Sequence, residues 1–145
     1  MIAVIQNIGG IRLSGFIYDS WSATLPEEIT DKFPYFECSM ANMKEIAKTA
    51  EECRVLLDVE ALNQFEQFLL NTYNEDLDYV KKVGSSNVEK ILNIYHINIE
   101  EDSIEDAIVK AGNKLGYLYI GENNRKPPGK IVTCHRMKNY DLNIY

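Results

Sequence analysis

The chain has 145 residues, of which 46% are hydrophobic and 26% charged, and its formal net charge is −7. This composition is typical of one globular domain and excludes a disordered chain, and no apolar stretch is long enough to span a bilayer. Three cysteines without close spacing favour a reducing compartment over a disulfide framework. We therefore expect a single α+β domain over residues 1–145, located in the cytoplasm, with a weak subdivision near 84–85.

The amino-terminal segment is predicted to form a β-hairpin. Residues 2–7 and 11–19 are rich in β-branched and aromatic side chains, which favour strands. Gly9 and Gly10 lie between the two segments and provide the turn. The apolar start lacks a basic leader, so it is interpreted as a strand and not as a secretion signal.

The middle of the chain is predicted to be helical. Ser86 and Glu89 have the spacing of a capping box, in which each side chain satisfies a free backbone donor of the other. Asp58 and Ser103 are suitable N-caps, and Gly116 is a suitable stop. The apolar residues between these signals recur at helical spacing. Five helices are predicted, a short one that Thr24 precedes and Pro34 closes, and four over residues 40–52, 59–73, 86–96 and 103–115.

The carboxyl-terminal segment is predicted to form a second hairpin. Strands are expected over residues 117–120 and 130–137, separated by a polar, proline-containing turn, with a short edge strand over 142–145. The order is therefore hairpin, helices, hairpin. It predicts an α+β fold with a mostly antiparallel sheet, built from the two hairpins and packed against a central group of helices.

No catalytic, cofactor or metal motif is complete in the sequence. The glycine-rich stretches lack the lysine and hydroxyl residue of a phosphate-binding loop. No two cysteines or histidines have the spacing of a chelating pair. A thiol–imidazole pair between Cys134 and His96, or between Cys38 and His135, stays open, as does Asp19 as an isolated carboxylate at a strand end. We therefore predict no catalytic residues, no cofactor and no metal, and a protein that is not an enzyme.

The densest charge feature is an acidic run near residue 100. Acidic side chains at the start of a helix stabilise the positive end of its dipole, but five acids in seven residues also suit a surface that meets a basic partner. The leading hypothesis is an inhibitor or immunity-type protein that neutralises a basic protein, such as a nuclease toxin, by electrostatic steering and occlusion. The predicted interface consists of Glu100, Glu101, Asp102, Glu105 and Asp106.

Two alternatives remain open. Residues 117–145 hold 5 basic against 2 acidic residues, so helices 86–96 and 103–115 with the basic hairpin could act as a winged helix. Its contacts to nucleic acid would be Arg125, Lys126 and Lys130, although the net charge makes nucleic acid an improbable partner. The other alternative is an enzyme whose site is assembled from distant residues, which motif searches miss.

Overall fold

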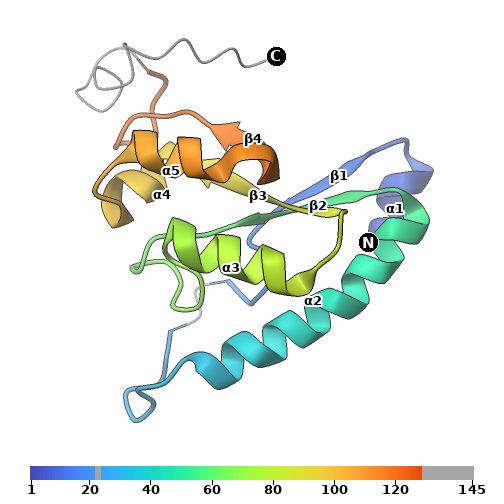
Figure 1. Cartoon of the computed structure of the whole chain (residues 1–145), viewed down its shortest axis with the longest axis horizontal. Helices are drawn as coiled ribbons and strands as arrows, with labels where there is room; N and C mark the ends of the chain where they lie inside the picture. The colour runs from blue at the N-terminus through green and yellow to red at the C-terminus, as the bar shows by residue number, and fades with distance from the viewer. Residues whose placement is uncertain (22–23, 129–145) are drawn as a thin grey trace.

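A computed structural model describes residues 1–21 and 24–128 of the chain, which alternate between helices and short strands (Figure 1). In chain order these elements are α1 (Ile2–Asn7), β1 (Arg12–Gly15), α2 (Phe33–Cys53), β2 (Leu56–Glu60), α3 (Tyr73–Val83), β3 (Val88–Asn93), α4 (Ile94–Glu100), α5 (Ile104–Ala111), the 3₁₀ turn η1 (Gly112–Lys114) and β4 (Leu115–Tyr119).

The four strands form one sheet in the order β1-β2-β3-β4, and every neighbouring pair is parallel. Ser14 is in register with Asp58, and Asp58 with Glu89. Parallel neighbours require a crossover connection, and helices α2, α3 and the pair α4–α5 provide the three crossovers. The predicted antiparallel α+β fold built from two hairpins is therefore wrong, because β1, β2 and β3 are each followed by helices that return the chain to the same end of the sheet.

Three of the predicted elements have a different structure. Residues 2–7 form helix α1 and not a strand, residues 61–72 of the predicted helix 59–73 are a non-helical connection between β2 and α3, and β3 lies within the predicted helix 86–96. Strands covered on both faces lack the polar–apolar alternation of an exposed sheet, so their sequences resemble those of buried helices. Asp58, which was interpreted as an N-cap, is fully buried inside β2. The predicted strands 130–137 and 142–145 lie outside the described residues.

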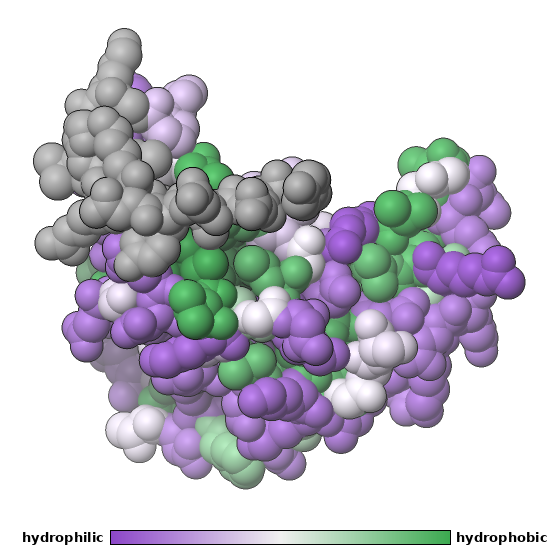
Figure 2. All heavy atoms as spheres, turned by 45° about the horizontal axis from the view of Figure 1, so that its top comes forward, coloured by the Kyte–Doolittle hydropathy of each residue, from purple (hydrophilic) through white to green (hydrophobic). Residues whose placement is uncertain are grey.

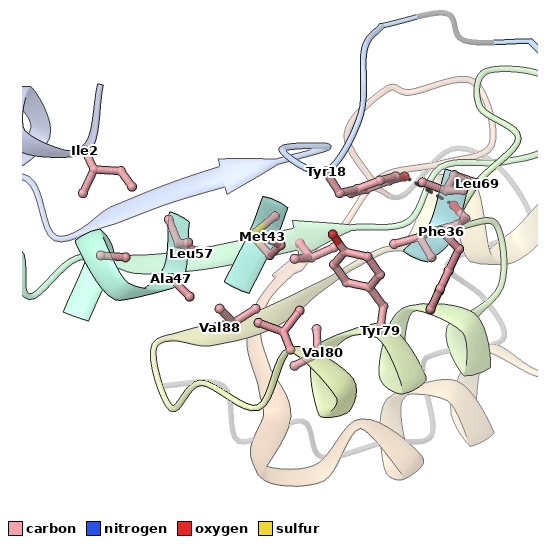
Figure 3. Packing of buried hydrophobic residues seen from close by; sticks show 14 of the residues in the cluster. Ile2, Tyr18, Phe36, Met43, Ala47, Leu57, Leu69, Tyr79, Val80 and Val88 are labelled. Atoms are coloured by element: carbon pink, nitrogen blue, oxygen red, sulfur yellow. Dashed lines mark hydrogen bonds between the residues drawn. The ribbon is translucent and has the colours of Figure 1, made fainter. Parts of the chain in front are cut away.

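One face of the sheet is covered by α2 and α3, which bury the larger hydrophobic core (Figure 3). Met43 and Ala47 of α2 and Tyr79 and Val80 of α3 contact it from the helical side, and Leu57 contacts it from β2. Part of the predicted helix 40–52 is thus confirmed within α2, including its apolar stripe. Helix α3 begins with a capping box between Thr72 and Glu75 that the sequence analysis missed.

A second core lies under α4 and α5. Ser103 caps α5 by accepting a hydrogen bond from the backbone N–H of Asp106, as predicted, whereas Gly116 lies inside β4. The members of this second core include Tyr73, Leu92, Ile94, Ile97, Ile104, Ala107 and Ala111.

None of the helices in residues 1–21 and 24–128 is long and apolar enough to cross a membrane.

The other face of the sheet carries a polar network. Side chains alternate between the two faces of a strand, so Asp58 points away from the helices that Leu57 and Val59 contact. Nη1 of Arg12 lies 2.5 Å from Oδ1 of Asp58 and 3.1 Å from Oε2 of Glu89. Three strands are therefore joined by one cation on this face.

Candidate functional site

The carboxyl ends of β2, β3 and β4 meet at a pocket of about 370 Å³. Ligands of parallel α/β sheets bind at this edge, where the strands stop and the loops begin. The volume is within the range of small-molecule sites. Three of the lining residues are the last residues of their strands. The described residues that line it are Glu60, Asn93, Tyr95, Tyr119, Ile120, Gly121 and Arg125.

The carboxylate of Glu60 is joined to Asn93 of the neighbouring strand. Nδ2 of Asn93 donates to Oε1 of Glu60 across 2.9 Å. Oδ1 of the same amide accepts a hydrogen bond of 3.1 Å from the backbone N–H of Tyr95 and thereby caps α4. These two partners fix the orientation of the amide, because a flipped amide would oppose two acceptors and two donors. Asn93 therefore presents a donor, and not a lone pair, to Glu60.

His96 lies behind Glu60 and is almost fully buried. Its Nδ1 accepts a hydrogen bond of 3.1 Å from the backbone N–H of Asn63, and burial lowers the pKa of the ring. The neutral ring consequently carries its proton on Nε2, the atom that lies 4.0 Å from Oε1 of Glu60. Of the two described residues of the open thiol–imidazole pairs, Cys38 and His96, only His96 lies near Glu60.

Arg125 closes one side of the pocket from the segment that follows β4. Its guanidinium forms an ion pair with Glu66, from the loop after β2, and its central carbon lies 4.3 Å from the centroid of the Tyr95 ring. The backbone of Arg125 has φ of 61°, a left-handed conformation that is uncommon outside glycine. The contacts to Glu66 and Tyr95 thus hold this segment against the pocket.

Two tyrosines of β4 form an exposed aromatic pair next to the pocket. The ring centroids of Tyr117 and Tyr119 are 5.1 Å apart, and the side chains are 52% and 40% exposed. Figure 2 shows a side of the molecule on which hydrophilic residues predominate and apolar residues gather in a few patches. Aromatic rings with a polar tip, next to charged and amide groups, suit a polyhydroxylated ligand that has both apolar C–H faces and hydroxyls.

The electrostatics of the pocket centre on Glu60. Burial raises the pKa of its carboxyl, an effect that the nearby Glu66 reinforces, while the Asn93 hydrogen bond and the charge of Arg125 oppose it. A raised pKa brings a carboxyl closer to neutral pH, where it can both accept and return a proton. Glu60 is therefore the candidate general base or acid of this pocket.

Proton transfer beside a carbonyl can be assisted by a divalent cation that polarises the carbonyl. Such a cation needs several carboxylate, carbonyl or imidazole lone pairs. Within the described part of the chain, no group of three His, Cys, Asp or Glu residues could hold a metal ion. Asn93 also presents an N–H donor, and not a lone pair, beside Glu60. These residues therefore do not fit a cation.

The residues of the predicted acidic interface lie on α4, α5 and the segment between them. Glu100 accepts a hydrogen bond of 2.7 Å from the backbone N–H of Gln64, and Glu101 accepts one of 2.6 Å from that of Tyr73. Two of the five acids thus satisfy backbone donors within the chain. Glu105 and Asp106 occupy the first turn of α5, and Asp102 is exposed. A role in partner binding for these side chains stays a prediction.

The other singled-out residues are scattered. Arg125 belongs to the pocket and Lys126 to the same exposed segment, while Lys130, Cys134 and His135 lie outside the described residues. The winged-helix order is wrong, because its first helix is replaced by β3 and α4. Asp19 caps the backbone N–H of Ser20 at 2.7 Å and does not line the pocket.

Sequence reasoning missed Glu60, Asn93 and Tyr119. The signal that could have revealed them is their position as the polar last residues of apolar segments, of which the segments that end at Glu60 and Asn93 are each followed by a crossover. That signal requires β2 and β3 to be identified as strands. Interpreting residues 59–73 and 86–96 as helices removed it.

Comparison with known proteins agrees with this geometry. A family model described as a xylose isomerase-like TIM barrel matches residues 4–142. The D-psicose 3-epimerase of Enterocloster bolteae is 45% identical over 121 residues, which cover 81% of this chain and 39% of that protein. The L-ribulose 3-epimerase of Mesorhizobium japonicum is 33% identical, covering 86% of this chain and 41% of that protein.

A solved structure of D-psicose 3-epimerase from Clostridium cellulolyticum H10 with D-tagatose superposes with a TM-score of 0.82 and 41% identity, covering 89% of this chain and 44% of that one. The chain spans about two fifths of the length of the curated relatives it matches. A complete barrel of this kind has eight parallel strands, and the described residues contribute four.

These relatives overturn the functional predictions from sequence. They are named as sugar epimerases, so the inhibitor or immunity-type hypothesis, the basic protein partner and the prediction that the protein is not an enzyme are wrong. Compact enzymes with acidic surfaces share the composition on which those predictions depended. Of the alternatives, only an enzyme with a site assembled from distant residues is compatible with the relatives. The matched model and the parallel β/α architecture agree over nearly the whole chain, and the chain therefore belongs to the xylose isomerase-like TIM barrel family.

Proposed function

We propose that this chain supplies part of the active site of a ketose 3-epimerase and that Glu60 is its proton-transferring group. The observation that carries the proposal is the position of Glu60, whose carboxyl has a raised pKa and lies in the pocket at the carboxyl edge of the sheet. The substrate class is supported by the relatives, which are named D-psicose, L-ribulose and ketose 3-epimerases.

Epimerisation at C3 of a ketose requires transfer of the proton beside the C2 carbonyl. A base takes the proton from C3, the electrons of the C–H bond move toward the carbonyl oxygen, and a proton returns to the opposite face of C3. Glu60 has the raised pKa that such a base needs. The N–H of Asn93 and the hydroxyl of Tyr119 line the same pocket and can donate to the oxygen on which charge develops.

Glu60 can transfer a proton at one face of C3 of the sugar. It is the single carboxylate among the described residues that line the pocket, whereas inversion at C3 uses proton donors and acceptors on both faces. A base on one face can remove the proton and return it to the same face. We therefore expect exchange of the C3 hydrogen with solvent to be faster than net formation of the epimer.

The test is incubation of the protein with D-fructose in D₂O, with deuterium at C3 followed by NMR and the epimer by chromatography. We expect deuterium at C3 with the unmodified protein and its loss in Glu60→Gln. Glu45→Gln, at an exposed position on α2, is the matched control and should exchange normally. Exchange that is absent from the unmodified protein, or that survives Glu60→Gln, would refute the proposal.

We also propose a cytoplasmic location. It is supported by the free thiols of Cys38 and Cys53, since reduced cysteines are usual in that compartment. Fractionation of the native cells tests it, and recovery of the protein in an extracellular fraction would contradict it.

A further inference from the structure

The groups around the Glu60 carboxylate present hydrogen atoms and not lone pairs. Asn93 donates through Nδ2 at 2.9 Å, and the protonated Nε2 of His96 lies at 4.0 Å. Burial and the charge of Glu60 raise the pKa of Tyr119, so its phenol keeps its proton at neutral pH. The hydrogen bond from Asn93 favours the charged form of Glu60 without any cation.

The lone pairs that a cation would need are occupied elsewhere. Oδ1 of Asn93 accepts the backbone N–H of Tyr95, and Nδ1 of His96 accepts the backbone N–H of Asn63. Freeing either atom would break a hydrogen bond at the start of α4 or in the loop after β2. Each such loss leaves a backbone donor without its partner, which is unfavourable.

We propose that this pocket binds its ketose without a divalent cation, because the Asn93 amide and the Tyr119 hydroxyl donate to the sugar oxygens that a cation would otherwise polarise. The identity of the ligand rests on the proposed function, whereas the exclusion of the cation rests on the donor geometry alone. The identity of the ligand and the exclusion of the cation can therefore be refuted independently.

The first experiment titrates Mn²⁺ alone into the full chain by isothermal titration calorimetry. We expect the unmodified protein and Glu60→Gln to bind Mn²⁺ equally weakly. Asn93→Asp keeps an N-cap for α4, because Asp caps as well as Asn, and it sets a second carboxylate beside Glu60. We expect this variant to bind Mn²⁺ at least about tenfold more tightly, since ligand charge tunes cation affinity over wider ranges.

Asn42→Asp, at an exposed position on α2, adds the same charge elsewhere and should leave Mn²⁺ affinity unchanged. One equivalent of Mn²⁺ bound by the unmodified protein and lost in Glu60→Gln would overturn the proposal. So would an Asn93→Asp variant that folds and gains no site. If Asn93→Asp does not fold, the comparison of the unmodified protein with Glu60→Gln still decides.

The second experiment measures binding of D-fructose in EDTA and in Mn²⁺. Equal affinity in both supports cation-free binding, and affinity that disappears in EDTA contradicts it. If D-fructose does not bind in either condition, the proposed function fails, while the Mn²⁺ titrations still judge the metal inference independently.

Discussion

Asn93 and Glu60 are the last residues of adjacent parallel strands, and the amide of the first donates to the carboxylate of the second across 2.9 Å. The hydrogen bond favours the charged form of Glu60, whereas burial favours the neutral form. Because burial is the larger effect, the pKa of Glu60 is raised. The ionisation of the candidate base is thus set by a residue 33 positions away in the sequence.

Replacing Asn93 with Thr should raise the pKa of Glu60 further. Threonine can still cap α4 with its hydroxyl, but the amide donor to Oε1 of Glu60 is lost. The measurement is a ¹³C NMR titration of the Glu60 carboxyl, assigned by comparison with Glu60→Gln. Asn42→Thr on α2 is the control and should leave the titration unchanged. A Glu60 pKa that stays constant in Asn93→Thr would show that the hydrogen bond has no electrostatic role.

Glu60 should also make the stability of the protein depend on pH. Its pKa is higher in the folded than in the unfolded state, so the folded state binds more protons between the two pKa values, and stability falls as pH rises through that window. The window begins at the ordinary glutamate value of about 4.3. Urea unfolding of the unmodified protein and of Glu60→Gln should diverge as pH rises above this value. Parallel pH profiles would contradict the assignment.

Of the caps predicted from the sequence, Ser103 is confirmed, whereas Asp58 lies inside β2 and Gly116 inside β4. Ser103 starts a helix as predicted because its capping interaction with Asp106 is local. The strand β3 was interpreted as a helix because Ser86 and Glu89 have the spacing of a capping box, whereas Glu89 lies in the strand and the adjacent Lys90 is fully buried and pairs with Asp76 on another element. Such a partner is fixed only by the tertiary fold. The pocket was missed for the same reason, because Glu60 and Asn93 meet only once β2 and β3 are paired.

Gly116 should not tolerate even a methyl group. A Cβ at this position would lie 2.5 Å from Oε2 of Glu89, 2.8 Å from Oδ1 of Asp58 and 2.9 Å from Nη1 of Arg12, which is the ion network of the polar face. Asp58 is fully buried and cannot move away. Gly116→Ala should therefore destabilise the protein by about 1–3 kcal/mol, as expected for overpacking.

Chemical denaturation measures this loss. Gly121→Ala is the control, because its Cβ would meet only the carbonyl oxygen of Lys126 at 3.8 Å, an ordinary van der Waals distance. Equal stabilities of the two variants would mean that the ion network moves aside at no cost.

Removing one partner of the buried pair of Lys90 and Asp76 should destabilise the protein strongly, whereas replacing both residues together should destabilise it by less than the sum of the two single changes. Nζ of Lys90 lies 3.9 Å from Oδ2 of Asp76 and 3.3 Å from the centroid of the Tyr73 ring, and both charged side chains are almost fully buried. Burial raises the pKa of Asp76 and lowers that of Lys90. Lys90→Met leaves the Asp76 carboxyl without its cation, so we expect a loss of about 3–5 kcal/mol in urea unfolding.

The double variant Lys90→Met with Asp76→Leu removes both charges and should lose less than the sum of the single variants, by about 0.5–3 kcal/mol. Lys82→Met, on the helix α3 that carries Asp76, is the matched control, because Lys82 pairs with Asp78 at 2.9 Å in an exposed position and exposed pairs contribute at most about 1 kcal/mol. If Lys90→Met is no more destabilising than Lys82→Met, or if the two buried substitutions are additive, the charges do not interact. The buried lysine would then be held by its contact with the Tyr73 ring and not by the carboxylate.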